Sequence, residues 1–148
     1  MELRRWTEGD IPKLTRVERV CFSQPWTTEM LKEEFSRAQG VGIVAEAAGE
    51  ILGYVCGSTL FEDAELMRIA VLPDYRGQGI GGDLADEFFK SVVALGARRV
   101  FLEVRATNEV ALGLYRSRGF EKTRLRKRYY AGGEDGLEMK KELFSDEE

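Results

Sequence analysis

The 148-residue sequence contains no histidine, and this absence removes several kinds of chemistry. It excludes Ser-His-Asp and Cys-His catalysis and most zinc sites, so we expect no metal. The two cysteines, Cys21 and Cys56, have no metal-ligand spacing and lie among apolar residues, which favours buried thiols in a reduced, cytoplasmic protein. Any acid–base chemistry must therefore come from Glu, Asp, Tyr, Lys or Cys.

Long hydrophobic runs are also missing. No apolar segment approaches the roughly 20 residues of a membrane span, and the N-terminus has no signal-peptide core, so no membrane association is expected. The net charge of −4 disfavours a general nucleic-acid-binding surface and suits a cationic or amine-bearing partner. With 43% hydrophobic and 32% charged residues, residues 1–148 are expected to form one soluble globular domain, and residues 145–148 a frayed acidic tail.

The chain is organised around a glycine-rich segment. An apolar run of strand length at residues 66–72 ends at Pro73, and apolar residues recur at helical spacing from Leu84 to Leu95, with Gly96 as the expected C′ residue. Glycines let backbone N–H groups turn towards one point, and a following helix adds its positive N-terminal end, an arrangement that suits an anionic phosphate. The glycines between the two elements are Gly77, Gly79, Gly81 and Gly82.

Three interpretations of this loop compete. A P-loop needs Lys and Ser/Thr after the last glycine, where Gly82 and Asp83 stand, so a nucleoside triphosphate is disfavoured. The dinucleotide fingerprint is present as Gly77, Gly79 and Gly82, with Glu103 near the place of a ribose-binding acid, but too few residues remain for a doubly wound fold. A turn that binds nothing is the third, although four glycines in six residues are entropically costly.

The other elements follow from periodicity and turn signals. A hairpin turn is expected at Ala48–Gly49, with Asp10 as the N-cap of the first helix and Thr27 or Thr28 as that of the second. The order of elements predicts a mixed α/β sheet. Further strands are predicted at 2–6, 40–47, 51–61, 98–105, 120–130 and 137–144. Further helices are predicted at 11–21 and 108–118, and between them one with apolar positions Met30, Leu31 and Phe35.

Two segments carry a family resemblance. I-A-V-L-P-D-Y-R-G-Q-G-I-G at 69–81 resembles the pyrophosphate-binding loop of the GNAT N-acetyltransferases, including the strand before it. F-L-E-V-R-A-T-N-E-V-A-L-G-L-Y-R-S-R-G-F at 101–120 resembles the RimI-type enzymes of that family, which acetylate the N-terminal alanine of a ribosomal protein. The resemblance runs from end to end and implies the GNAT acyl-CoA N-acyltransferase fold, a mixed, mostly antiparallel sheet flanked by helices, with acetyl-CoA as co-substrate.

The resemblance also implies functional residues. Glu103 would be the general base and Tyr115 the general acid beside the coenzyme, whose thiolate it would steady. Asn108 would contact the coenzyme. The pantetheine arm would pair with amides of Ile69, Ala70 and Val71. The pyrophosphate would lie on Arg76, Gly77, Gln78, Gly79, Ile80, Gly81 and Gly82.

The residues themselves leave alternatives open. Glu103 could form an ion pair with Arg105 or Arg98, Tyr115 could be ordinary core packing, and Asn108 could be a helix N-cap. On the acceptor side, the resemblance implies contacts from three segments. They are the loop after the first helix (Pro25 and Trp26), the strand before the glycine loop (Glu65, Met67 and Arg68) and a loop near the C-terminus (Tyr129 and Tyr130). The aromatic residues among them could equally pack at the rim of the acceptor groove.

These observations predict a cytoplasmic enzyme, a monomer or weak dimer, that transfers acetyl from acetyl-CoA to a protein or peptide N-terminal amine. A ribosomal protein that starts with Ala or Ser is a candidate acceptor. We expect direct attack in a ternary complex, because neither cysteine is expected near the thioester. The alternatives are an acetyltransferase for lysine side chains or small polyamines, and an acyl-CoA-binding module without turnover.

Overall fold

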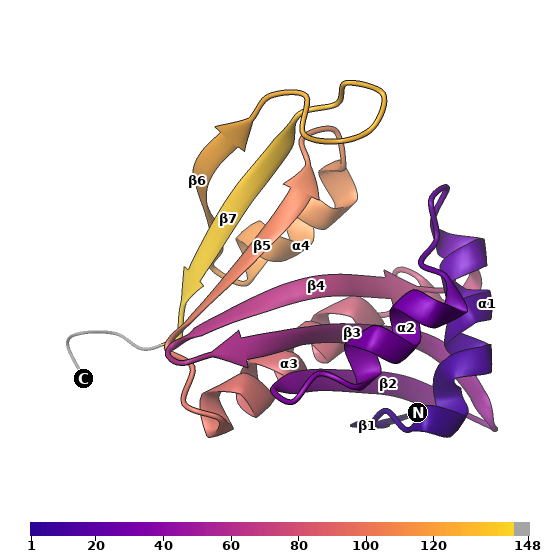
Figure 1. Ribbon diagram of the computed structural model, residues 1–148. Coiled ribbons are helices and arrows are strands. Elements are labelled where there is room, and N and C mark those ends of the chain that lie inside the picture. Colours follow the sequence, from indigo (N-terminus) through magenta and orange to yellow (C-terminus); the bar gives the residue numbers. More distant parts are fainter. Residues whose placement is uncertain (144–148) are drawn as a thin grey trace.

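The computed structural model describes residues 1–143, which form a seven-stranded sheet flanked by helices (Figure 1). The order of elements confirms the predicted mixed α/β fold. In chain order they are β1 (Glu2–Arg5), η1 (Glu8–Asp10), α1 (Ile11–Cys21), α2 (Thr28–Phe35), β2 (Gly40–Ala47), β3 (Glu50–Leu60), β4 (Asp63–Val71), η2 (Pro73–Tyr75), α3 (Ile80–Ala94), β5 (Arg99–Arg105), α4 (Glu109–Ser117), β6 (Glu121–Arg126) and β7 (Gly136–Glu142).

The sheet divides between its two parallel strands. Its order is β1-β2-β3-β4-β5-β7-β6, and every neighbouring pair is antiparallel except β4 with β5. These two strands pair only from Asp63 to Glu65, opposite Arg99 to Phe101. Beyond this point they diverge, and β5, β7 and β6 rise away from the rest of the sheet (Figure 1). The remainder of β4 therefore has no strand partner on its β5 side within residues 1–143.

A β-bulge in β4 changes which residues face which layer. The register against β3 shifts at Gly57 and leaves Met67 as an extra residue on β4. Leu66, before the bulge, belongs to the core under α3, whereas Ala70, after it, belongs to the core under α1. A Cβ at Gly57 would lie 2.0 Å from a carbonyl oxygen of β4, so glycine lets β3 approach the bulge. The bulge places Arg68 on the same face as Ala70, because alternate residues of a strand share a face.

Two hydrophobic cores cover the two faces of the sheet. Helix α3 packs on one face, where Phe88 is fully buried, and α4 extends this core through Leu112. Helices α1 and α2 cover the other face through Leu14 and Leu31, both fully buried. Figure 1 shows α1 and α2 in front of the strands and α3 behind them. The edges of β4 and β5 that face each other beyond their short pairing are left open between these layers.

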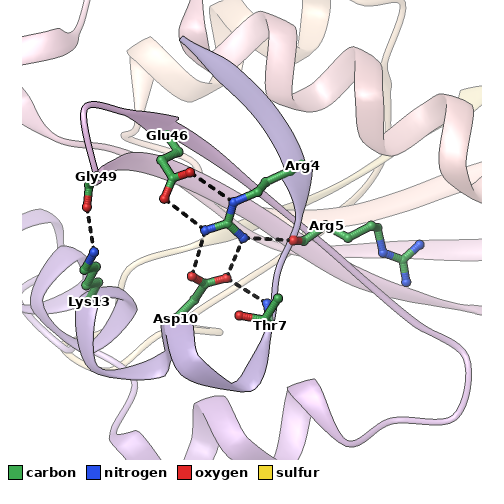
Figure 2. Close-up of polar contacts among 7 residues, drawn as sticks. All are labelled: Arg4, Arg5, Thr7, Asp10, Lys13, Glu46 and Gly49. Atoms are coloured by element: carbon green, nitrogen blue, oxygen red, sulfur yellow. Dashed lines mark hydrogen bonds and ion pairs between the residues drawn. The ribbon is translucent and has the colours of Figure 1, made fainter.

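Arg4 ties β1 to η1 and β2 (Figure 2). Its guanidinium donates to both carboxylate oxygens of Asp10 at 2.9 Å and to Glu46 at 3.1 and 3.2 Å. Asp10 also accepts the N–H of Thr7 at 2.7 Å, and its hydrogen bond to Arg4 lowers the pKa of this carboxyl. Asp10 is the N-cap residue of α1, as predicted, but its side chain makes no capping hydrogen bond, because the carboxylate faces Arg4.

Other local predictions hold with small shifts. Thr27 caps α2 by accepting the N–H of Met30 at 3.2 Å, and Gly96 follows α3 with φ +98°. Strand β6 ends at Arg126 and not at residue 130, since the chain turns at Arg128, where φ is +53°. The last predicted strand is present as β7, but Phe144 and the predicted tail lie outside the described residues. No helix in the described part is long and apolar enough to cross a membrane, and residues 1–143 contain no cluster of potential metal ligands.

Candidate active site

The unpaired edge of β4, the glycine loop and the start of α4 surround a cavity of about 540 Å³. Most of the predicted coenzyme-binding residues meet here, although Gln78 and Tyr115 do not line it. Cys21 and Phe22, from the end of α1, form part of the wall and were not predicted. The predicted residues that line the cavity are Ile69, Ala70, Val71, Arg76, Gly77, Gly79, Ile80, Gly81, Gly82 and Asn108.

The glycines of the loop have two different functions. Gly77 and Gly79 have φ of +79° and +85°, and a Cβ built on either would meet no atom within 4 Å. Gly79 directly precedes α3, whose first N–H groups and positive end suit an anionic group. Gly82 lines the cavity too, and a Cβ there would lie 2.0 Å from the Arg118 guanidinium, so this glycine leaves room for the end of that side chain. Pyrophosphate binding by the open part of the loop stays a prediction.

The carbonyl oxygen of Val71 accepts hydrogen bonds from two cavity residues. Arg76 Nε donates at 2.9 Å and the Cys21 thiol at 3.4 Å. Cys21 therefore lies in the wall of the candidate coenzyme cavity, because the end of α1 packs on β4, whereas Cys56 does not line it. Burial raises the pKa of this thiol and that of the fully buried Cys56, which keeps both protonated and weakly nucleophilic. Direct attack without a covalent intermediate stays our prediction.

Asn108 serves as the N-cap of α4. Its Oδ1 accepts the N–H of Ala111 at 3.1 Å. Among residues 1–143 its side-chain nitrogen has no hydrogen-bond partner and remains free to donate to a ligand. The cap and the predicted coenzyme contact are compatible because they use different atoms.

Glu103 lies in a second cavity, of about 620 Å³, between the β3–β4 hairpin and strands β5 and β7. Glu65 and Tyr129, two of the predicted acceptor residues, line the same cavity. Arg126 from β6 forms an ion pair with Glu103, with Nε 2.9 Å from Oε1 but without hydrogen-bond alignment. The other oxygen, Oε2, is buried and has no hydrogen-bond partner in the described chain. The carboxylate therefore keeps one oxygen free for a proton.

The surroundings of Glu103 raise its pKa above the usual value. Burial is the main cause of the raised pKa. The positive charges of Arg126 and, less strongly, Arg124 lower the pKa, whereas the negative charges of Glu138 and Glu65 raise it. Of the two ion-pair partners that the sequence suggested, Arg105 pairs with Glu134 at 2.6 Å and not with Glu103. A carboxylate with a raised pKa, a free oxygen and a place in a cavity has the properties of a general base.

Tyr115 is both a core residue and a candidate acid. It is 6% exposed, and its ring packs against Phe120 with 5.6 Å between centroids. Its hydroxyl makes no hydrogen bond within the described chain. Burial and the nearby Tyr130 raise its pKa, so the hydroxyl holds its proton at neutral pH. Packing does not exclude the predicted acid role, which stays a prediction.

The remaining acceptor residues do not all share one cavity. Pro25 and Trp26 line a separate one of about 290 Å³, and Met67, the bulge residue, is 38% exposed. Tyr129 and Tyr130 contact each other edge to face at 5.0 Å. They are held by cations, Tyr129 by Arg126 at 4.9 Å and Tyr130 by Arg105 at 4.3 Å. Arg68 is largely enclosed by its own protein partners.

Arg126, like Cys21 and Phe22, is a site residue that the sequence did not predict. The sequence shows a strand rich in positive charge, and Arg124 and Arg126 are two apart, so they share a face. The two arginines lie within 3.9 and 3.7 Å of Glu138 on β7, the strand that also places Glu138 opposite Glu103. The sequence shows the alternating positive charges. It does not show that β6 pairs with β7 and β7 with β5, and these two pairings bring Arg126 to Glu103.

Two parallel strands diverge beside a glycine loop and a helix N-terminus, next to a cavity whose carboxylate has one oxygen without a partner. This is the arrangement that the resemblance to acyl-coenzyme A-dependent transferases implies. Residues 11–120 match the Acetyltransferase (GNAT) family, and the chain belongs to this family. The recognised fold and family are thereby confirmed, and acetyl-CoA is the acetyl donor.

Similar proteins include ribosomal-protein acetyltransferases. A Bacillus subtilis protein assigned as a ribosomal protein bS18-alanine N-acetyltransferase is 38% identical over 137 residues, which cover 88% of this chain and 87% of that protein. The ribosomal protein bS18-alanine N-acetyltransferase of Escherichia coli K12 is 30% identical over 136 residues, 88% of this chain and 89% of that one. The crystal structure of the E. coli ribosomal-protein-S18-alanine N-acetyltransferase superposes with a TM-score of 0.91 at 26% identity, covering 97% and 94% of the two chains.

Proposed function

We propose that this acetyltransferase acts on the α-amine of a protein N-terminus, with Glu103 as general base. The observation that carries the proposal is the state of Glu103: an ionisable carboxylate of raised pKa, with one oxygen free, in a cavity beside the diverging strands. The similarity to ribosomal protein bS18-alanine N-acetyltransferases supports the choice of acceptor. A ribosomal protein that begins with Ala or Ser is the candidate substrate.

Each part of the site has a defined task in this reaction. Acetyl-CoA supplies an acetyl thioester. Gly77, Gly79 and the first N–H groups of α3 hold the pyrophosphate, and the unpaired N–H and C=O groups of β4 bind the extended arm as a neighbouring strand would. Glu103 accepts the proton that the acceptor amine loses, directly or through water. The Tyr115 hydroxyl keeps a proton available for the sulfur that leaves.

The base strength of Glu103 suits an α-amine better than a lysine. An α-amino group has a pKa of about 7.7–8.0, and a lysine amine about 10.4, so far more of the α-amine is neutral near pH 7. The raised pKa of Glu103 makes it a stronger base towards either amine, so the difference between the two acceptors comes from their own pKa values. The chemistry of the site therefore favours an N-terminal amine as the acceptor.

The proposal includes the setting in which the enzyme works. It acts as one domain in the cytoplasm, as a monomer or weak dimer, on a polypeptide acceptor and without nucleic acid. The cavity that contains Glu103 opens beside the β3–β4 hairpin and the residue 37–39 segment, which leaves room for the residues that follow an acceptor N-terminus.

Paired peptides test the acceptor. Each starts with Ala or Ser and contains one internal lysine, and one member of each pair has a blocked N-terminus. Mass spectrometry after incubation with acetyl-CoA should show one added acetyl group on the free peptide alone. Glu103→Gln should lower kcat by roughly a hundredfold or more, while acetyl-CoA affinity stays unchanged.

The outcomes separate the alternatives. Equal labelling of the blocked peptides would make the protein a side-chain acetyltransferase. No labelling of any peptide, with acetyl-CoA still bound, would leave a small amine such as a polyamine, or a binding module without turnover. An unchanged rate in Glu103→Gln would remove Glu103 from the role of base.

A further inference from the structure

Glu18 is a buried carboxylate in the middle of the apolar face of α1. It is 0% exposed, and both its oxygens are used. Oε1 accepts the backbone N–H of Trp26 at 2.7 Å and Arg68 Nη2 at 2.7 Å. Oε2 accepts Arg68 Nε at 3.1 Å and the hydroxyl of Tyr54. This carboxylate thus joins α1, β3, β4 and the segment before α2.

Arg68 holds the same segment from the side of β4. Its guanidinium lies 3.7 Å from the centroid of the Phe22 ring and 4.9 Å from that of the Trp26 ring. Its Nη2 also donates to the carbonyl oxygen of Gln24 at 3.3 Å. One side chain therefore contacts three residues of the segment 22–26, and the bulge at Met67 turns it towards them.

The segment 22–26 connects the two sides of the reaction. Phe22 and the adjoining Cys21 line the coenzyme cavity, and the Cys21 thiol donates to Val71 on β4. Arg68 itself stands next to Ile69, the first residue of the β4 edge that lines this cavity. Trp26, at the other end of the segment, is one of the predicted acceptor residues, and Arg68 lies against its ring. The contacts of Arg68 thus reach a residue of the coenzyme cavity and a predicted acceptor residue.

We propose that Arg68 is a positioning residue, which together with Glu18 fixes residues 22–26 over β4 and so orients the acceptor polypeptide against the acetyl donor. This inference rests on the proposed function for its kinetic part. It replaces the prediction that Arg68 contacts the substrate. Arg68 acts through Phe22, Gln24 and Trp26.

Stability alone does not account for such a pair. Apolar side chains of similar volume in place of a buried ion pair often leave a protein as stable or more stable, whereas loss of one partner leaves an uncompensated charge. The pair does supply a fixed geometry: a planar guanidinium presents a rigid fork to the carboxylate and a flat face to the aromatic rings. Orientation of the segment is what these contacts provide.

The decisive variant removes both charges together. In Glu18→Gln with Arg68→Met, the amide can still accept from the N–H of Trp26 and donate to the Tyr54 oxygen, so the fold is kept, but every contact of the guanidinium is lost. Arg68→Lys keeps the charge without the fork and flat face. The matched control is Arg4→Met with Asp10→Asn, which removes another arginine bound by both oxygens of a carboxylate, far from residues 22–26 (Figure 2).

Two measurements are made on the full-length protein. At saturating acetyl-CoA, the double variant at 18 and 68 should lower kcat/KM for a free N-terminal peptide by roughly ten- to a hundredfold, mainly through KM, because displacing a positioning group by about 1 Å can cost that much. Arg68→Lys should fall between this variant and the wild type, and the control should match the wild type. Hydrogen exchange should show faster exchange of the amides at 22–26 in the double variant and not in the control.

The two measurements fail in different ways. Unchanged exchange at 22–26, or an acceptor KM that rises equally in the control, overturns the positioning role. A wild-type enzyme that acetylates no N-terminal peptide overturns the proposed function, and the exchange result then still decides whether Arg68 fixes the segment.

Discussion

Replacing Arg126 with methionine tests whether the environment of Glu103 makes it a base. The change removes the cation whose Nε lies 2.9 Å from Glu103 Oε1, and a methionine keeps much of the apolar contact with Tyr129. Arg126 counteracts the effect of burial on the pKa of Glu103, so its removal should raise that pKa further. The acid limb of activity should move to higher pH, because a general base works only when it is ionised.

The structure bounds the size of this change. An opposite charge within about 4–6 Å lowers a carboxyl pKa by about 1–3. The Arg126 side chain is 32% exposed and that of Glu103 is 20% exposed, so solvent screens the pair and the lower end applies. Glu138 and Glu65 keep their charges and continue to favour the protonated form. We therefore expect the Glu103 pKa to rise when Arg126 is removed, and the acid limb of kcat/KM to move with it.

Two assays measure it. Carbon-13 NMR of labelled glutamate carboxyls gives the titration of Glu103 directly, once Glu103→Gln has identified its signal. The pH dependence of kcat/KM for a free N-terminal peptide gives the same change as a displaced limb. The peptide amine titrates identically with every variant, so the difference between profiles belongs to the enzyme. The matched control is Arg124→Met, since Arg124 is 56% exposed and pairs with Glu138 at 3.9 Å.

Three results would contradict the reasoning. A Glu103 titration that stays in place in Arg126→Met would mean that the ion pair does not act on the carboxylate. An equal displacement in Arg124→Met would mean that the general charge of β6 matters and the close pair does not. A displaced titration with an unmoved kinetic limb would separate Glu103 from catalysis.

Three further predictions concern glycines and the Arg4 cluster. Gly79→Val should abolish acetyl-CoA binding measured by calorimetry, whereas Gly96→Val, at the other end of α3 and also at positive φ with open space around it, should keep it; equal loss would refute the loop assignment. Gly113 lies inside α4 with nothing within 4 Å of a new Cβ, so Gly113→Ala should raise the free energy of unfolding by about 0.5–1 kcal/mol. Gly57→Ala should lower the free energy of unfolding by about 1–3 kcal/mol or more, because its Cβ would meet the backbone of β4. Urea unfolding measures both changes. Asp10→Asn should lower the free energy of unfolding by about 1.5–3 kcal/mol at pH 7, because it removes the charged partner of Arg4. The pKa of Asp10 is lowered in the folded protein, so this loss should persist down to about pH 4 and vanish as the pH falls further. A loss that stays constant with pH would exclude the Arg4 pair as its cause.

Local signals in the sequence were sufficient for most elements. The strand over residues 40–47 was placed to the residue, since Gly40 and the Ala48–Gly49 turn mark its ends. Thr27 and Asn108 could be recognised as caps because a cap needs only its neighbours. The glycine loop was recognisable for the same reason: a strand, turn residues and a helix in direct succession.

Long-range pairing was what the sequence could not supply. The bulge at Met67 depends on how β3 meets β4, so the direction of Arg68, and its burial against Glu18, could not be read from either strand. The pairing of Arg126 with Glu103 needs two strand registers, β6 with β7 and β7 with β5. Cys21 reaches Val71 only because α1 packs across the sheet.

The short pairing of β4 with β5 has a consequence for the whole molecule. An exposed strand edge usually invites another polypeptide to add itself, which is a route to aggregation. Here the open edge lies inside a wedge in the middle of the sheet, whose walls begin at normal strand spacing at Asp63 to Glu65 and separate only gradually. Because β5 already pairs with β4 at that end, another polypeptide cannot pair along the whole length of β4, and the open part is short. The protein thus keeps a strand edge for binding without placing it at the outer edge of the sheet.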